Sequence, residues 1–237
     1  MGRAFEFRKE RKFKRWANMA KTFTRLGRDI VIAVKEGGPN PDTNPRLRAV
    51  IQNAKAANMP KANIERAIKK ATEKDTANYK EVLYEGYAPH GVAVLVETAT
   101  DNINRTVAEV RAAFNKGNGN MGNSGSVIFL FDHICNFTLA GNDDIDMENL
   151  ELELIDYDVE EVFAEGDQII IYAPFEQFGS IQKYLEENSY EIISSGFDWI
   201  PTTHVQLEGE KAGEVEKLLE RLENVDDVQK VHHNMTQ

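Results

Sequence analysis

YEGYAPHGVAVLVETATDNINRTVAEVRAAFNKG, residues 84–117, decides the fold class because its hydrophobic period changes partway along. Turn residues are followed by an apolar, β-branched run that begins at Val92, which predicts a strand within residues 84–100. The candidate helix caps Asp101 and Asn104 come next. Apolar residues then recur at helical spacing: Val107, Val110 and Phe114. A strand followed at once by an amphipathic helix predicts an α+β fold.

The sequence further along repeats this order of elements. A Gly/Asn-rich loop, residues 116–126, leads into SVIFLF, a second predicted strand. Near the C-terminus, THVQLEGE predicts a strand, KAGEVEKLLERLENV a helix and DDVQKVHHN another strand. Two strand–helix–strand units predict a ferredoxin-like domain made of residues 81–140 and 202–237.

Residues 141–201, between these two halves, have elements of their own. MENLELELID and PFEQFGSIQKYLEENS predict helices, and Pro174 opens the second one. VEEVFAEGDQIIIYA predicts two strands that turn at Gly166 and Asp167, and YEIISSGF predicts another. We expect an inserted acidic α+β domain, whose many carboxylates form a solvated surface.

The first 80 residues predict three helices joined by short loops. From Trp16 onward, apolar residues recur every three or four positions, which predicts a long amphipathic helix that ends at the GGP of residues 37–39. Asn44 and Pro45 are suited to the cap and first turn of a second helix, and the MP of residues 59–60 separates it from a third. The predicted fold class is therefore α+β: an N-terminal three-helix domain followed by a ferredoxin-like α+β domain with a second small α+β domain inserted.

Charge divides the chain at the end of these helices. Residues 1–80 contain 20 Lys or Arg and 8 Asp or Glu, a net charge of +12. The whole chain contains 28 and 39 such residues, so by subtraction residues 81–237 contain 8 basic and 31 acidic residues, a net charge of −23. This asymmetry is typical of a protein whose basic part binds nucleic acid or another anionic surface.

Basic residues of the first and third predicted helices are the candidate phosphate ligands. On the first helix they recur at intervals of three, four and seven, which gathers them on one side, away from the apolar stripe. Arrays of this kind bind phosphate backbones because each neutralised phosphate releases counterions. The candidate nucleic-acid-binding residues are Arg8, Lys9, Arg11, Lys12, Lys14, Arg15, Lys21, Arg25, Arg28, Lys61, Arg66, Lys69 and Lys70.

The loop KGNGNMGNSGS, residues 116–126, contains a literal G-x-G-x-x-G at Gly117, Gly119 and Gly122. A dinucleotide-binding or phosphate-binding loop must follow a strand and open a helix, so that helix N–H groups point at the phosphate. Here a predicted helix precedes the loop and a predicted strand follows it. We therefore interpret this segment as a flexible turn with a contact role, and we expect no nucleotide cofactor.

The sequence lacks the residue patterns of an enzyme or a metalloprotein. The five histidines have no C-x-x-C or H-E-x-x-H companion, and the adjacent His232 and His233 would point to opposite faces of a strand. No G-x-S-x-G elbow occurs. Cys135 lies in an apolar stretch and is expected to be a buried, reduced thiol. We expect no catalytic residue, no metal and no cofactor.

The longest apolar stretches are far too short to span a bilayer, and the basic start of the chain has no apolar run behind it. These features predict a soluble, cytoplasmic protein with no membrane partner.

Several motifs, taken in order, resemble the YebC/PmpR family. They are RWANMAK, EGGPNPDTNPRLRAVIQNAKAANMPKANIERAIKKAT, YEGYAPHGVAV, TDNINRTVAEVRAAF and GNMGNSGSV, which densely cover about the first half of the chain. The acidic second half resembles the family mainly in the order of its elements. One departure is the extended start MGRAFEFRKERKFK, where the family usually has a short GHSKW-like start, so a role of that opening histidine does not carry over.

The resemblance implies a three-domain, non-enzymatic cytoplasmic regulator of gene expression. Some members of the family are described as DNA-binding transcriptional regulators, and others as translational activators that act with ribosomes. The charge pattern supports polyanion binding in either case. The interpretation is therefore a DNA-binding transcriptional regulator, with a ribosome-associated translation factor that binds ribosomal RNA as the first alternative. A protein-interaction adaptor, whose acidic domains recruit a basic partner, is the second. In any of these cases the acidic domains are expected to contact a ribosome or a protein partner.

Overall fold

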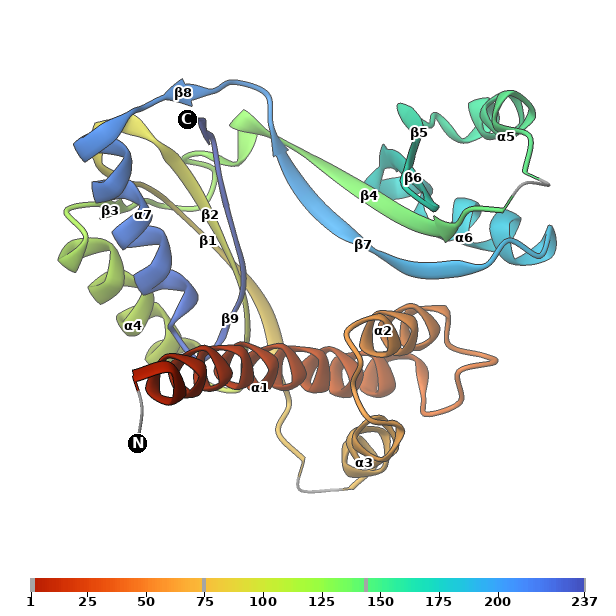
Figure 1. Cartoon of the computed structure of the whole chain (residues 1–237), viewed down its shortest axis with the longest axis horizontal. Coiled ribbons are helices and arrows are strands. Elements are labelled where there is room, and N and C mark those ends of the chain that lie inside the picture. Colours follow the sequence, from red (N-terminus) through yellow and green to blue (C-terminus); the bar gives the residue numbers. More distant parts are fainter. Residues whose placement is uncertain (1–2, 74–75, 143–144, 237) are drawn as a thin grey trace. The chain divides into compact units, whose positions relative to one another are not determined.

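The computed structural model describes residues 3–73, 76–142 and 145–236. The chain folds as two compact units, Met1–Thr76 and Ala77–Gln237 (Figure 1). The first unit is helical, and the second contains two four-stranded sheets with helices. The predicted fold class, α+β with N-terminal helices, is therefore confirmed.

The helical unit consists of α1 (Arg3–Gly37), α2 (Pro45–Ala56) and α3 (Lys61–Ala71). Its core comes from apolar residues at helical spacing on all three helices. The buried set includes Ile30, Ala33, Val34, Leu47, Ala54, Ile64 and Ala71.

Asn44 fixes the turn between α1 and α2. Its Oδ1 accepts a hydrogen bond from Leu47 N at 3.0 Å, and its Nδ2 donates to the carbonyl oxygens of Ala33 at 2.7 Å and Gly38 at 2.8 Å. A Cβ on Gly37 would come within 2.7 Å of the Asn44 side chain. The predicted cap, with Pro45 in the first helical turn, is confirmed, and the turn requires glycine because the buried amide occupies the adjacent space.

The first sheet has the strand order β3-β1-β2-β9. Its strands are β1 (Lys80–Tyr87), β2 (Ala93–Thr100), β3 (Asn120–Met121) and β9 (Val228–His233), and α4 (Ile103–Lys116) and α7 (Gly209–Glu223) pack on one face. The shared core includes Tyr84, Val94, Val96, Val110, Phe114, Val215, Leu218 and Leu222. The short strands β8 (Val205–Gln206) and β10 (Met235–Thr236) pair in parallel.

Local details of this region differ from the sequence-based expectation. The strand expected from Val92 onward is β2, and the turn residues of APHG form the short 3-10 helix Pro89–Gly91 before it. Residues 84–87 belong to the end of β1, which was not expected and which pairs with β2 as a hairpin. SVIFLF is not a strand, since Ile128–Leu130 form a 3-10 turn and the next strand begins at Phe131. The cap of α4 is Asn102, whose Oδ1 accepts from Arg105 N at 3.1 Å.

The second sheet has the strand order β5-β6-β4-β7, with every pair antiparallel. Its elements follow in the order β4 (Phe131–Ala140), α5 (Met147–Leu154), β5 (Glu161–Glu165), β6 (Gln168–Pro174), α6 (Phe178–Glu187) and β7 (Ile192–Pro201). This β-α-β-β-α-β order is the ferredoxin-like one. The inserted segment thus carries that arrangement, and β4, which was expected in the host sheet, pairs with β6 and β7 instead.

The two sheets of the second unit are joined by β4 and β7 and by contacts between β7 and β9. Lys230 Nζ on β9 donates to the Phe197 carbonyl oxygen on β7, and His232 of β9 lies 2.9 Å from a carboxylate oxygen of Asp198. Thr202 N donates to Leu130 O at 2.9 Å, so the two ends of the segment that forms the second sheet lie next to each other. Among the described helices, none is long and apolar enough to cross a membrane.

Candidate nucleic-acid interface

The basic residues of α1 that the structure describes lie on one side of the helix. Lys21, Arg25 and Arg28 are separated by four and three residues, which places them within about 60° of the helix circumference. Lys21 is exposed, whereas Arg25 and Arg28 are partly buried. Six further candidates belong to the α1 backbone, but their side chains lie outside the described part: Arg8, Lys9, Arg11, Lys12, Lys14 and Arg15.

The candidates on α3 face away from the core of the helical unit. Arg66, Lys69 and Lys70 are exposed and lie within about 100° of the circumference, opposite the buried Ile64 and Ala71. Lys69 and Lys70 also occupy the last turn, where positive charge is stabilised by the helix dipole. Lys61 is exposed at the other end of the helix, 3.7 Å from Glu65. The three clustered side chains are therefore positioned to reach a phosphate backbone.

Other basic residues of the helical unit hold the fold together instead. Arg46 forms an ion pair with Glu36 at 2.6 Å, and Arg48 donates hydrogen bonds to the carbonyl oxygens of Pro41 and Asp42. Lys35 Nζ donates to Thr76 O at 2.8 Å. The assignment of the candidate residues to nucleic-acid binding stays a prediction. Arg66, Lys69 and Lys70 are exposed on α3, whereas Arg46 and Arg48 bond to residues next to the α1–α2 turn.

The glycine-rich loop encloses a carboxylate of the protein itself. Glu85, on β1, is 4% exposed, and its two carboxylate oxygens accept hydrogen bonds from the backbone N–H groups of Gly125 at 2.6 Å, Val127 at 2.8 Å and Ile128 at 2.9 Å. The loop donates from its backbone as a phosphate-binding loop does, but its anion is internal. No sequence motif indicates this role of Glu85, which lies near the end of β1 and whose donors are about 40 residues away along the chain.

These hydrogen bonds decide the ionisation of Glu85. Burial removes the carboxylate from water, which by itself raises its pKa, but the backbone N–H groups of residues 125–128 outweigh that effect and lower the pKa below its ordinary value. Gly86 belongs to the same arrangement, because a Cβ there would meet Asn120 O at 2.7 Å and the Phe114 ring at 2.8 Å. The loop is thus a structural element of the first sheet.

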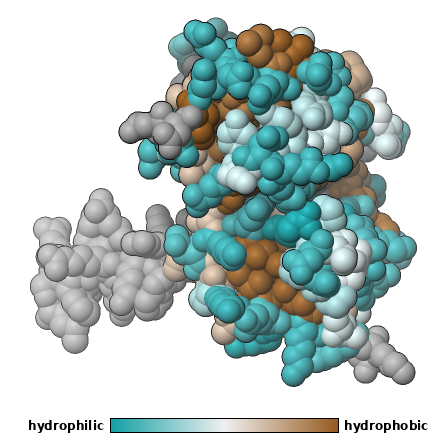
Figure 2. Space-filling model, turned by 90° about the vertical axis from the view of Figure 1, so that its right-hand side faces the viewer, coloured by the Kyte–Doolittle hydropathy of each residue, from teal (hydrophilic) through white to brown (hydrophobic). Residues whose placement is uncertain are grey.

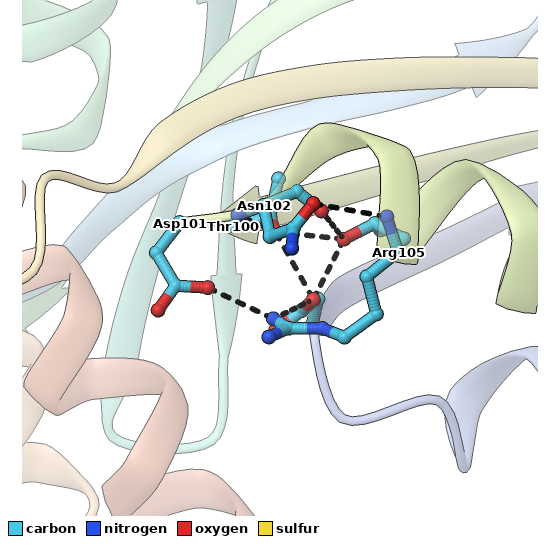
Figure 3. A network of polar contacts seen from close by, with 6 residues as sticks. Thr100, Asp101, Asn102 and Arg105 are labelled. Atoms are coloured by element: carbon cyan, nitrogen blue, oxygen red, sulfur yellow. Dashed lines mark hydrogen bonds and ion pairs between the residues drawn. The ribbon is translucent and has the colours of Figure 1, made fainter.

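A second internal network joins α4 to the turn that precedes β9 (Figure 3). The buried carboxylate oxygen Oδ2 of Asp227 accepts hydrogen bonds from Arg105 at 2.7 Å, Thr106 at 2.6 Å and Thr100 at 3.1 Å, and Arg105 also bonds Asp101. Burial would raise the pKa of Asp227, yet hydrogen bonds from Arg105 and the two threonines lower it. Arg105 is committed to these carboxylates rather than to an external phosphate.

The described titratable side chains outside these networks are not grouped as metal ligands. Within the described ranges, no three His, Cys, Asp or Glu residues are grouped so that they could hold a metal ion. His232 lies between Glu97 and Asp198, while His233 alternates to the other side of β9. Cys135 is a buried free thiol, as predicted, and burial raises its pKa to about 12.

Hydrophilic residues cover most of the face in Figure 2, with smaller hydrophobic patches between them.

Comparisons with known proteins agree along nearly the whole chain. A family model described as "TACO1/YebC protein N-terminal domain" matches residues 3–74, and one described as "TACO1/YebC second and third domain" matches residues 79–235. A probable transcriptional regulatory protein of Flavobacterium johnsoniae is 66% identical over 99% of both chains, and one of Parabacteroides distasonis is 57% identical over 99% of this chain and 97% of its own length. The names of these relatives support a regulatory role.

A solved structure has a similar fold. The crystal structure of a conserved hypothetical protein of Aquifex aeolicus matches with a TM-score of 0.75 and 43% sequence identity, and the match covers 92% of this chain and 90% of that one.

Proposed function

The chain belongs to the TACO1/YebC family, and from this premise we propose that it is a cytoplasmic, non-enzymatic regulator of gene expression that binds nucleic acid through its helical unit. The names of the relatives, probable transcriptional regulatory proteins, make duplex DNA the first ligand to consider. The second unit then contacts other partners.

One observation carries this proposal. Arg66, Lys69 and Lys70 form an exposed basic cluster on α3, inside a segment whose net charge is +12. Elsewhere in the same unit, Arg46 and Arg48 bond to the protein itself. Exposed cations on one side of a helix bind a phosphate backbone by releasing its counterions, which gives an affinity that falls steeply with salt.

The test measures the salt dependence of binding. Replacing Arg66, Lys69 and Lys70 by Gln removes up to three phosphate contacts, so the slope of log affinity against log salt on duplex DNA is expected to fall by up to about 2.7. The matched control replaces Lys183, Lys211 and Lys217 by Gln, which changes the charge equally but lies in the second unit, where all three are exposed. An unchanged slope in the α3 variant, or an equal loss in the control, would contradict the proposal.

A second candidate, ribosome-associated translation factor, is favoured by the charge of the second unit. Residues 81–237 carry −23, which repels a DNA duplex that approaches this part of the protein. A ribosome presents structured RNA together with basic proteins, and such a surface can attract both the basic and the acidic part of the chain.

A further inference from the structure

Among the described helices of the second unit, α5 and α6 pack on one face of the second sheet, and none packs on the other face. Cys135, Phe137 and Leu139 of β4, with Ile169 and Ile171 of β6, are buried against α5 and α6. Since neighbouring strand residues point to opposite sides, the residues between them form the other side, which we call the open face. The open face includes Asn136, Thr138, Ile170, Tyr172, Glu161, Phe163 and Glu165.

The open face combines apolar rings with carboxylates near the edge of the sheet. Phe163 of β5 is 38% exposed, and its ring lies 5.9 Å from that of Tyr172 on β6. Glu161 and Glu165 are exposed on either side of Phe163, so the three successive open-face residues of β5 are an acid, an aromatic residue and an acid. In the register, Glu161 lies opposite Tyr172, and Phe163 lies opposite Ile170.

β5 is also the last strand of its sheet, and no described strand pairs with its outer side. An exposed edge strand offers backbone groups to an added strand from another chain. Natural edges are commonly protected by lysine, but this one carries glutamate. Like charges oppose pairing between two copies of β5, whereas an extended basic segment would meet opposite charges at alternate positions.

The net charge of residues 131–201, the segment that forms the second sheet and its helices, indicates the class of partner. Residues 131–201 contain 18 Asp or Glu and one basic residue, Lys183, a net charge of −17. Aromatic residues on the open sheet of a ferredoxin-like domain can stack RNA bases, but such sites also need positive charge for the phosphates. The domain has almost none.

We propose that the open face and the β5 edge bind an extended, Lys/Arg-rich segment of a partner protein. The segment adds to the sheet beside β5, its basic side chains pair with Glu161 and Glu165, and its aliphatic stems cover Phe163 and Tyr172. This site is separate from the basic cluster on α3, so its failure and the failure of nucleic-acid binding can be distinguished.

The test uses the full chain and a dye-labelled peptide of alternating arginine and threonine. Replacing Glu161 and Glu165 by Gln is expected to weaken binding roughly fivefold, since each lost pair is a surface ion pair of modest strength. The matched control replaces Glu148 and Glu151 by Gln, which are exposed on α5 across the sheet and change the charge equally. We expect this control to change the affinity less than twofold.

Amide chemical shifts measured during the titration locate the site. We expect the peptide to perturb residues of β5 and β6, and an unlabelled peptide of alternating glutamate and threonine to leave them unchanged. If the Glu161 and Glu165 substitutions and the Glu148 and Glu151 substitutions weakened binding equally, net charge alone would explain the effect and the proposal would be overturned. Perturbation of Phe163 and Tyr172 by a single-stranded RNA, rather than by the basic peptide, would overturn it in favour of RNA binding.

Discussion

At the scale of the residue, Glu85 receives hydrogen bonds from three backbone N–H groups of one loop, so its side chain must supply only acceptors. In Glu85→Gln, the amide would turn an NH2 group toward some of these donors. Burying unmatched donors is expected to lower the free energy of unfolding by about 3 kcal/mol. Urea unfolding at neutral pH measures the loss, and Glu109→Gln, an exposed substitution on α4 with the same charge change, should cost less than about 0.5 kcal/mol.

The pH dependence of this effect has a defined sign. Because the folded-state pKa of Glu85 is lowered, its contribution is fully present above the unfolded-state pKa of about 4.3 and is lost as pH falls through the folded-state pKa. The difference between the wild type and Glu85→Gln should therefore shrink in acid. A difference that is constant from neutral pH into acid would show that the lost bonds do not depend on the charge.

His232, at the junction of the two sheets, gives stability a pH dependence of the opposite sign to that of Glu85. Its ring nitrogens lie 2.9 Å from Glu97 on β2 and from Asp198 on β7. His133 and His233 also interact electrostatically with His232, and Lys230 interacts with Asp198. Burial lowers the pKa of His232, but the hydrogen bonds to the two carboxylates outweigh this and raise it. The imidazolium therefore stabilises the fold below the unfolded-state pKa of about 6.5, and this contribution is lost as pH rises through the folded-state pKa.

We expect the wild type to exceed His232→Gln in stability by about 2 kcal/mol below pH 6.5 and by less at higher pH. Thermal unfolding of both proteins across this range measures the difference, and an NMR titration of the His232 ring should give a pKa above the ordinary value. His133 and His233, whose pKa values are lowered by burial, contribute in the opposite direction and are common to both proteins. A difference that grows with pH would contradict the assignment.

At the scale of the element, the sequence predicted what depends on local chemistry. Asn44 and Pro45 identify the start of α2 because capping involves neighbouring residues only. Which strands pair with one another was harder to predict, because hydrophobic periodicity does not specify that β4 pairs with β6 and β7. The Glu85 and Asp227 sites were missed for the same reason, because their donors lie about 40 and 120 residues away in sequence.

The strand pairing leads to a prediction about the inserted domain. Ile134 lies opposite Asp198 in the β4–β7 register, so replacing residues 135–197 by Asn-Gly should close a short hairpin that keeps Phe131, Trp199 and Asp198 in place. Phe131 and Trp199 are needed because they pack on Ala93 and Leu95 of the first sheet. We expect a monodisperse protein with one cooperative thermal transition.

Excising residues 141–201 instead removes β6 and β7, the two strands that pair with β4. The backbone groups and apolar side chains of β4 would then be exposed, and we expect aggregation, measured by light scattering. If this shorter excision stayed monomeric and the Asn-Gly replacement aggregated, β4 would have to be stabilised by the first sheet instead.

At the scale of the whole molecule, the charge distribution distinguishes between the two proposed ligands, duplex DNA and the ribosome. Residues 1–80 carry +12 and residues 81–237 carry −23, a distribution that suits a target with both anionic and cationic surfaces. Duplex DNA offers only the first. The separation could be counted from the sequence, but the structure adds that the charges of Arg105, Asp227, Glu85 and His232 are used internally.

Sedimentation of a cell lysate through a sucrose gradient distinguishes these ligands. A DNA-binding regulator should be absent from ribosomal fractions and should protect defined promoter DNA from nuclease. A ribosome-bound factor should migrate with ribosomal particles after DNase treatment and dissociate at high salt, because both of its charged parts contribute to binding. The Arg66, Lys69 and Lys70 variant and the Glu161 and Glu165 variant identify the contacts: on a ribosome both should reduce co-migration, whereas on promoter DNA only the first should reduce protection.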